Sequence, residues 1–172
     1  MVIAAGGEKM FEIGDKIVYP LHGAGEIEKI EEKEILGEKK EYYILKMPFG
    51  GMKVMIPTSN SNEIGIRNII SRKQAYEVID FFSPERCDVS VNWNKRYREN
   101  MDRLKSGNII DVADVVNTLM VRDKEKGLST GERKMLNSAK KILFSELILA
   151  AGLEMDELED KIKHKLYDDI EC

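Results

Sequence analysis

The sequence has 172 residues, of which 42% are hydrophobic and 34% are charged, so it can form one or two small domains. No apolar run approaches the roughly 20 residues that a bilayer-spanning helix needs, and we expect no membrane partner. The formal net charge of −4 argues, taken alone, against a nucleic-acid-binding protein.

Residues 1–9 differ from the rest of the chain, and we expect an extra N-terminal segment without fixed structure. The first strand-like pattern opens at Met10, which makes this residue a candidate native start. Residues 6–9 fit a translated ribosome-binding site, because codons for Gly-Gly-Glu-Lys can spell a purine-rich stretch.

Residues 10–70 have a β pattern. Short runs of β-branched and aromatic residues alternate with glycine-containing turns at residues 22–25 and 49–51. Residues 26–36 place isoleucines among charges without clean alternation, which predicts a long, exposed, bulged strand. Several short strands in this length indicate a small, strongly bent sheet or barrel. The predicted strands are residues 16–20, 26–36, 41–47, 52–57 and 67–70.

The strand predicted at residues 52–57 has two candidate roles. Its alternating apolar residues, Met52, Val54 and Ile56, fit a strand that faces a core. Its backbone could equally be a sheet edge that pairs with a strand of a partner, limited by Pro57, which has no amide hydrogen.

From residue 71 the apolar residues follow a helical period. Pro84 ends the first helix, and residues 83–91 form a polar linker. Ser129 and Glu132 have the spacing of a capping box, in which each residue satisfies an unpaired amide of the other. The fold class is therefore α+β, with a β domain followed by an all-α domain. The predicted helices are residues 73–82, 93–105, 109–126, 129–151 and 154–170.

Enzyme chemistry has no visible site. The two histidines, His22 and His164, lack a spaced partner that would make a metal site or a catalytic triad. Cys87 and Cys172 give neither a metal-binding spacing nor a disulfide framework, which is typical of a reduced cytoplasmic protein. We expect no catalytic residue, metal, cofactor or small-molecule substrate.

Charge is unevenly distributed along the chain. Residues 1–82 hold 11 basic and 13 acidic side chains, residues 83–141 hold 13 and 9, and residues 142–172 hold 3 and 9. A basic middle segment therefore lies between acidic ends. This asymmetry is more informative about partners than the net charge.

The basic segment contains the only tryptophan, Trp93, at a predicted helix start beside Lys95, Arg96 and Arg98. Composition alone does not decide between a tryptophan in the helical core and an exposed one. Polar residues precede it, and a helix N-terminus with adjacent cations is a natural phosphate site. A large apolar side chain held between phosphate contacts can enter a minor groove and unstack a base step. For the three cations, the alternative is a solvated helix face.

Arg133 and Lys134 fall in the first turn of the helix predicted from residue 129. Cations at this position oppose the helix dipole, so an external anion is a reasonable partner. A capped surface turn is the alternative.

Two sets of residues form a recognisable pattern. The N-terminal set is Gly14-Asp15, Val18-Tyr19-Pro20, His22-Gly23, Gly37-Glu38, Lys40-Glu41-Tyr42, Leu45-Lys46 and Pro57. The C-terminal set is Asn92-Trp93, Arg96-Tyr97, Asn100, Leu104, Ser106-Gly107, Ala113, Val115-Val116, Leu119, Arg122-Asp123, Gly127-Leu128-Ser129, Gly131-Glu132, Met135-Leu136 and Ile142-Leu143. In this combination the chain resembles the CarD/CdnL family of bacterial transcription regulators. The N-terminal set alone is also similar to a module of transcription-repair coupling factors.

The resemblance implies that residues 10–70 form a Tudor-like or SH3-like small β-barrel domain that docks on the β subunit of RNA polymerase. It implies that residues 92–172 form a helical domain that meets promoter DNA at the upstream edge of the transcription bubble, after a helix and linker at residues 71–91. Trp93 occupies the position of a wedge that stabilises the melted state. The DNA-binding residues predicted in this way are Trp93, Lys95, Arg96, Arg98 and Arg133, to which we add Lys134 from its place in the same turn.

Two polymerase-contact positions depart from the family pattern. Lys33 keeps the charge of a family arginine but not its forked geometry, and Met55 keeps neither, so we expect docking to be weaker or differently balanced. The predicted polymerase-binding residues are Lys33, Lys53, Val54, Met55, Ile56 and Pro57.

The sequence thus predicts a monomeric, non-enzymatic initiation factor, cytoplasmic and associated with the nucleoid through RNA polymerase. Docking would raise the local concentration of the wedge, so a weak basic patch suffices. The alternative is an adaptor that binds polymerase or a repair factor through its β domain and does not contact DNA.

Overall fold

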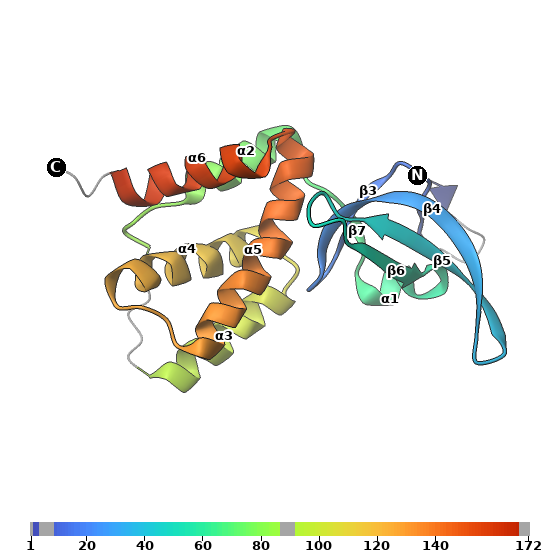
Figure 1. Ribbon diagram of the computed structural model, residues 1–172, viewed down its shortest axis with the longest axis horizontal. Helices are drawn as coiled ribbons and strands as arrows, with labels where there is room; N and C mark the ends of the chain where they lie inside the picture. The colour runs from blue at the N-terminus through green and yellow to red at the C-terminus, as the bar shows by residue number, and fades with distance from the viewer. Residues whose placement is uncertain (1, 4–8, 87–91, 169–172) are drawn as a thin grey trace.

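The structure of the chain is a computed structural model that describes residues 2–3, 9–86 and 92–168. Its N-terminal part is an antiparallel five-stranded sheet in the order β6-β5-β4-β3-β7, and helices follow (Figure 1). This arrangement confirms the predicted α+β fold class. The strands of the sheet are β3 (Lys16–Tyr19), β4 (Gly23–Ile35), β5 (Glu38–Lys46), β6 (Lys53–Pro57) and β7 (Arg67–Asn68).

The sheet encloses a small apolar core of its own. Tyr43 and Leu45 of β5 point into this core, with exposed fractions of 1% and 0%. The backbone amide of Phe11 donates a hydrogen bond of 3.1 Å to the Tyr43 hydroxyl, so the buried phenol has its polar atom satisfied. The remaining buried members of this core are Phe11, Ile17, Ile27, Met47, Ile56 and Ile66.

A long hairpin of β4 and β5 extends beyond this core (Figure 1). The pairing register shifts between Ile27 and Lys29, which confirms the predicted bulge. The hairpin turn is formed by Leu36 and Gly37, with φ angles of 54° and 80°. Positive φ at both central residues is typical of a type I′ turn, whose twist matches that of the paired strands.

Three short features differ from the prediction. A 3₁₀ helix, η1 (Thr58–Asn60), and a helix of one turn, α1 (Ser61–Ile64), follow β6 and are too short to show a helical period. The expected absence of structure in residues 1–9 is wrong for β1 (Val2–Ile3) and for Lys9. The reason is backbone pairing, because β1 runs antiparallel to β2 (Lys9–Met10).

The predicted longer helices are present, with boundaries shifted by a few residues. Ser129 begins the longest of them, and both bonds of its capping box with Glu132 are formed. Gly152 ends it in the left-handed conformation, with φ of 68°. The helices are α2 (Arg72–Phe81), α3 (Trp93–Lys105), α4 (Ile109–Glu125), α5 (Thr130–Ala151) and α6 (Met155–Tyr167).

Helix α2 belongs to the helical core and is not merely a connection. Ala75, Val78 and Ile79 are buried in the cluster that α4, α5 and α6 also supply. The amide of Asn117 on α4 binds the backbone of Ser83 through bonds of 2.9 and 3.0 Å, which fixes the chain just after α2. Of the predicted linker, residues 87–91 lie outside the described residues.

Candidate functional site

Trp93 is the first residue of α3 and lies against the first turn of α5. Its indole Nε1–H donates a hydrogen bond of 3.0 Å to the Ser129 hydroxyl. Its ring stacks on Tyr97, with centroids 5.1 Å apart and an angle of 24° between the planes. A Cβ built on Gly131 would lie 3.5 Å from the indole Cζ2 atom, so the ring rests on the α5 backbone. With these contacts made, 42% of the Trp93 surface remains exposed.

The structure therefore places Trp93 between the two alternatives, a tryptophan in the helical core and an exposed one. One edge of the indole is anchored to α5, and its only polar atom is satisfied by Ser129. Tyr97, which packs against the helical core, supports one face of the ring. The exposed part can stack on another group without breaking a hydrogen bond.

Arg96 has a different position from the predicted one. Its exposed fraction is 3%, and its Nε lies 2.6 Å from Oε1 of the buried Glu132. Arg96, Asn100 and Leu104 repeat at a spacing of four residues and form the stripe of α3 that faces the core. The predicted phosphate contact is thus corrected, because burial and Glu132 already occupy this guanidinium.

Glu132 joins α3 and α4 to the start of α5. Burial favours the protonated form and raises the pKa of Glu132, but hydrogen bonding and charge from Arg96, together with hydrogen bonds from Ser129, outweigh burial and lower the pKa overall. Arg122 on α4 approaches the same carboxylate, with its Nε 4.0 Å from Oε1. The ionised carboxylate therefore holds together the helices on which Trp93 rests.

The other predicted DNA-binding cations are exposed and do not form one cluster. Lys95 and Arg98 point about 160° and 140° away from Trp93 around the α3 axis, by the rotation of an α-helix. Nζ of Lys95 is 3.9 Å from the carboxylate of Glu99. In the first turn of α5, Arg133 pairs with Asp123 at 2.8 Å and retains 53% side-chain exposure, and Lys134 is exposed. These surface pairs are weak, so the cations can exchange partners for phosphate.

The structure brings together the two predicted polymerase-contact positions that depart from the family pattern. Nζ of Lys33 on β4 lies 3.6 Å from Sδ of Met55 on β6, across the intervening strand β5. Lys53 pairs with Glu28 at 2.9 Å, and its hydrogen bond lowers the pKa of Glu28 despite the opposing effect of burial. Together these residues define the outer sheet face.

Strand β6 forms one edge of the sheet, because β5 is its only partner among the strands that the structure describes. Ile56 is fully buried, so it can take part in the predicted polymerase contact only through its backbone. Val54 and Pro57 are half-buried at the same edge. The predicted core role of this strand is confirmed for Ile56, and its pairing with a strand of a partner stays a prediction.

Sequence reasoning missed the residues that hold Trp93 in place. Ser129 was recognised as a helix cap and, like Tyr97, as part of the family pattern, but neither was linked to Trp93. Ser129 lies 36 residues beyond Trp93, so no local pattern links them. For Arg96 a signal existed, namely its spacing with Asn100 and Leu104.

Other kinds of site find no support in the part of the chain that the structure describes. Within residues 2–3, 9–86 and 92–168, no group of histidine, cysteine and acidic side chains could hold a metal ion. In the same ranges, no helix is both long and apolar enough to cross a bilayer.

The β domain and the helical domain each match a known family model. The model described as "CarD-like/TRCF RID domain" matches residues 11–70. The model described as "CarD, C-terminal domain" matches residues 77–163. The chain therefore belongs to the CarD/CdnL family of transcription factors, which is not known as an enzyme family. Its RID domain indicates RNA polymerase interaction in this family.

Two individual proteins illustrate the relationship. The candidate transcription factor YdeB of Bacillus subtilis (strain 168) is 43% identical over 150 residues, which are 87% of this chain and 98% of that protein. The solved structure named "CdnLNt from Myxoccoccus xanthus" is 40% identical, with a TM-score of 0.32, and the match covers 40% of this chain and 96% of that one.

Proposed function

We propose that the protein docks on the RNA polymerase β subunit and stabilises the promoter open complex by inserting Trp93 into the minor groove at the upstream edge of the bubble. The observation that supports this proposal most strongly is the exposed indole, held by Ser129, Tyr97 and Gly131. In this proposal residues 10–70 contact polymerase and residues 92–172 contact DNA. The connection at residues 71–91 includes α2, which packs with the second unit.

A side chain that is already ordered before it meets DNA unstacks bases at a lower entropic cost. Ordering a free rotamer on binding costs about 0.5–1.5 kcal/mol per side chain. Trp93 avoids much of this cost, because its ring plane is fixed by Tyr97 and its nitrogen by Ser129. When an apolar residue is inserted at a base step, the new contacts offset the free energy of unstacking.

The phosphate contacts that we propose are few. Arg133 and Lys134 lie beside the N-terminus of α5, where backbone amides also attract anions, and Lys95 and Arg98 lie on other sides of α3. Few contacts give weak binding to ordinary duplex, which fits a protein with a net charge of −4. Docking on polymerase compensates by raising the local concentration of Trp93 at the promoter.

The docking surface that we propose is the outer sheet face and the adjoining edge of β6. It offers the charge of Lys33 and Lys53, the thioether of Met55 and the edge backbone of β6. An exposed sheet edge can accept a strand from a partner. Lys33 and Met55 stand where the family has arginines. Charged side chains therefore contribute less to docking, relative to the backbone of β6, than in the family pattern.

A fluorescent base analogue tests the proposal. 2-Aminopurine placed at the upstream edge of the bubble brightens when it is unstacked. We expect the wild-type protein to increase its fluorescence in polymerase–promoter complexes and Trp93→Ala not to. Equal fluorescence with both proteins, while both remain bound to polymerase, would contradict the wedge and favour an adaptor that does not contact DNA.

A further inference from the structure

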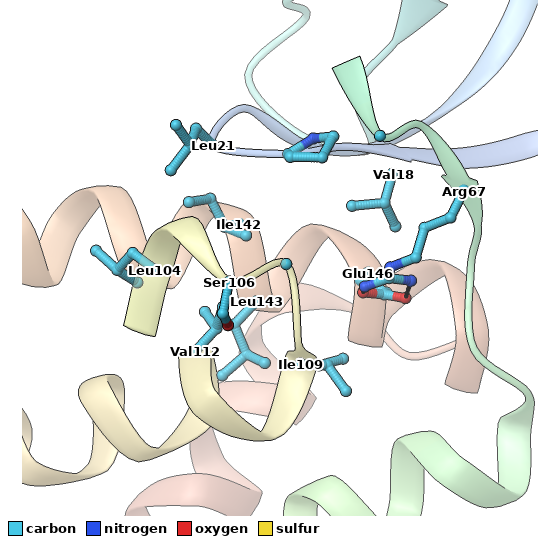
Figure 2. Close-up of a pocket in the computed structure, with 13 residues that line it drawn as sticks. Val18, Leu21, Arg67, Leu104, Ser106, Ile109, Val112, Ile142, Leu143 and Glu146 are labelled. Atoms are coloured by element: carbon cyan, nitrogen blue, oxygen red, sulfur yellow. Dashed lines mark hydrogen bonds and ion pairs between the residues drawn. The ribbon is translucent and has the colours of Figure 1, made fainter. Parts of the chain in front are cut away.

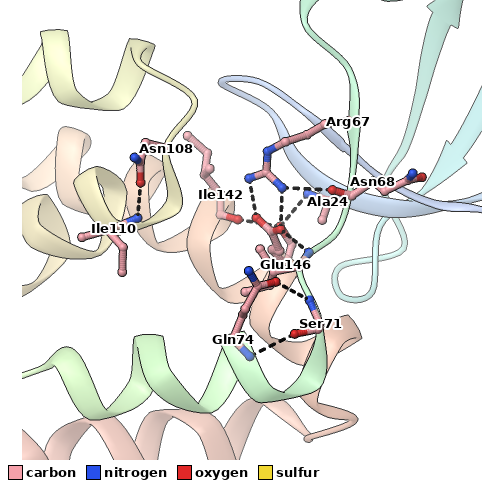
Figure 3. A network of polar contacts seen from close by, with 11 residues as sticks. Ala24, Arg67, Asn68, Ser71, Gln74, Asn108, Ile110, Ile142 and Glu146 are labelled. Atoms are coloured by element: carbon pink, nitrogen blue, oxygen red, sulfur yellow. Dashed lines mark hydrogen bonds and ion pairs between the residues drawn. The ribbon is translucent and has the colours of Figure 1, made fainter. Parts of the chain in front are cut away.

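The two domains meet at the C-terminal half of α5, where Glu146 occupies the centre of a polar network (Figure 3). Glu146 is only 2% exposed although it is charged. Both terminal nitrogens of Arg67, on β7, donate to its carboxylate at 2.7 and 2.8 Å. The backbone amide of Ile70, in the segment that leads to α2, donates to it at 3.0 Å. One helical side chain thus binds two successive parts of the sheet domain.

A second contact lies one residue earlier on α5. The amide of Ala24, at the start of β4, donates a buried hydrogen bond of 2.8 Å to the Ser145 hydroxyl. Gly23 allows this close approach, because a Cβ there would lie 2.7 Å from Ser145 Oγ and 3.3 Å from the Lys141 carbonyl oxygen. The bonds of Ser145 and Glu146 to the sheet domain are called the interdomain contact below.

The apolar packing beside the interdomain contact is incomplete. A cavity of about 210 Å³ lies between Val18 and Leu21 on the sheet side and Leu104 and Ile142 on the helical side (Figure 2). Unfilled space cannot resist rotation of one domain on the other, because it supplies no contacts on that side. The directional bonds of Glu146 and Ser145 therefore constrain the orientation of the domains beside this cavity.

Helix α5 connects this contact to Trp93. The indole rests on Ser129 and Gly131 in its first turn, and the interdomain contact starts at Ser145. The 14 residues from Gly131 to Ser145 span about 21 Å at the rise of an α-helix. Since the helix is capped at both ends, it acts as a rigid spacer.

We propose that Glu146 is a positioning residue: with Arg67, Ile70 and the neighbouring Ser145, it fixes the sheet domain on α5 and thereby sets the place of Trp93 relative to the outer sheet face. The consequence for promoter DNA rests on the function proposed above. A fixed joint concentrates the indole at one point of the docked complex, whereas a loose joint spreads it over a larger volume.

Pairs of spin labels measure the orientation directly in the full chain. Cys87 and Cys172 are replaced by serine, and labels are attached to Lys46→Cys on β5 and Glu125→Cys on α4. We expect one narrow distance distribution for the otherwise wild-type chain and a clearly broader one for Glu146→Gln and for Ser145→Ala. Asp114→Asn is the matched control, because it breaks an ion pair with Arg103 inside the helical domain only.

Promoter experiments with the same variants test the consequence. We expect Glu146→Gln to bind polymerase as wild type does and to shorten the lifetime of the open complex by about tenfold, as the effective concentration of the indole falls. A purely structural role would leave this lifetime unchanged when folding and polymerase binding are intact.

An unbroadened distance distribution for Glu146→Gln would overturn the inference. A broadened distribution with an unchanged lifetime, where Trp93→Ala does shorten it, would contradict the consequence for promoter DNA. If Trp93→Ala itself leaves the lifetime unchanged, the function proposed above fails. The distance distributions still decide whether Glu146 fixes the domains.

Discussion

The indole nitrogen of Trp93 donates to the same Ser129 hydroxyl that accepts the amide of Glu132, at distances of 3.0 and 3.2 Å. This hydroxyl therefore begins α5 and orients the ring on α3. Its own proton can point to Oε2 of Glu132, 3.2 Å away, so the one donor and both acceptor positions of the hydroxyl are engaged in hydrogen bonds. A change at the cap should consequently affect both folding stability and the position of Trp93.

We expect Ser129→Ala to lower the free energy of unfolding by about 1 kcal/mol, the usual cost of losing an N-cap. It should also loosen the indole, since the Trp93 N–H loses its acceptor. Denaturant unfolding measures the first effect, and tryptophan fluorescence anisotropy measures the second. The anisotropy signal comes from Trp93 alone, because it is the only tryptophan in the sequence.

Ser71→Ala is the matched control for this substitution. Ser71 forms the same kind of capping box with Gln74 at the start of α2, but it does not contact Trp93. The control should lose similar stability and leave the anisotropy unchanged. Equal anisotropy changes in the two variants would show that the Ser129 bond does not orient the ring.

We expect Arg96→Ala to destabilise the protein by about 3–5 kcal/mol, because it leaves the buried Glu132 carboxylate without its closest charged partner. Arg103→Ala, which breaks the exposed pair with Asp114, should cost at most about 1 kcal/mol. Urea unfolding compares the two variants. A small cost for Arg96→Ala would argue that this arginine is a surface residue after all.

Stability should depend on pH through Glu132. Its pKa in the folded protein is below the ordinary value of 4.5, because Arg96 and Ser129 favour the carboxylate more than burial opposes it. A depressed folded pKa adds stability that is complete above the unfolded value and is lost as pH falls through the folded value. The stability difference between wild type and Glu132→Gln should therefore shrink as pH falls below 4.5. A difference that is constant over this range would rule out the linkage.

A substitution in the turn between β4 and β5 should raise the thermal stability of the protein. Leu36 is 99% exposed and has φ of 54°, a conformation that costs leucine about 1 kcal/mol and suits asparagine better. We expect Leu36→Asn to raise the melting temperature. Leu36→Ala, which also removes the exposed side chain but keeps the unfavourable φ, should leave it nearly unchanged. A similar rise in both would attribute the gain to lost apolar surface.

Docking should respond to charge on the outer sheet face. We expect Lys33→Glu to weaken binding to the polymerase β subunit by about 3- to 10-fold, mainly through slower association, as for a charge at the rim of an interface. Lys126→Glu, an equal charge change after α4, is the control and should bind as wild type does. Surface-immobilised β subunit gives both rate constants. Unchanged association for Lys33→Glu would move the docking surface elsewhere.

Much of the fold could be predicted because it depends on local patterns. The spacing of Ser129 and Glu132 predicted the start of α5, and Gly50 and Gly51 predicted the turn between β5 and β6. The turn predicted at residues 22–25 is wrong for Gly23 to Gly25, which begin β4. Helix α1 was missed because four residues cannot show a helical period. The paired backbone of Val2–Ile3 was missed because so short a strand has no pattern of its own.

The site was less accessible from sequence, because its contacts join distant segments. Arg96 lies in a basic run and was taken for a surface cation, although the spacing to Asn100 and Leu104 places it on the buried stripe. The contact between Trp93 and Ser129 depends on how α3 packs on α5, which no local pattern specifies. The same holds for Arg67 and Glu146, which are 79 residues apart.

The lifetime of a preformed open complex, challenged with a competitor that traps free polymerase, tests the wedge most directly. Wild-type protein should prolong this lifetime, Trp93→Phe should retain part of the effect because an aromatic face remains, and Trp93→Ala should abolish it. Polymerase binding, measured in parallel, should be the same for all three proteins. The account is contradicted if Trp93→Ala prolongs the lifetime as much as the wild-type protein while binding polymerase equally well.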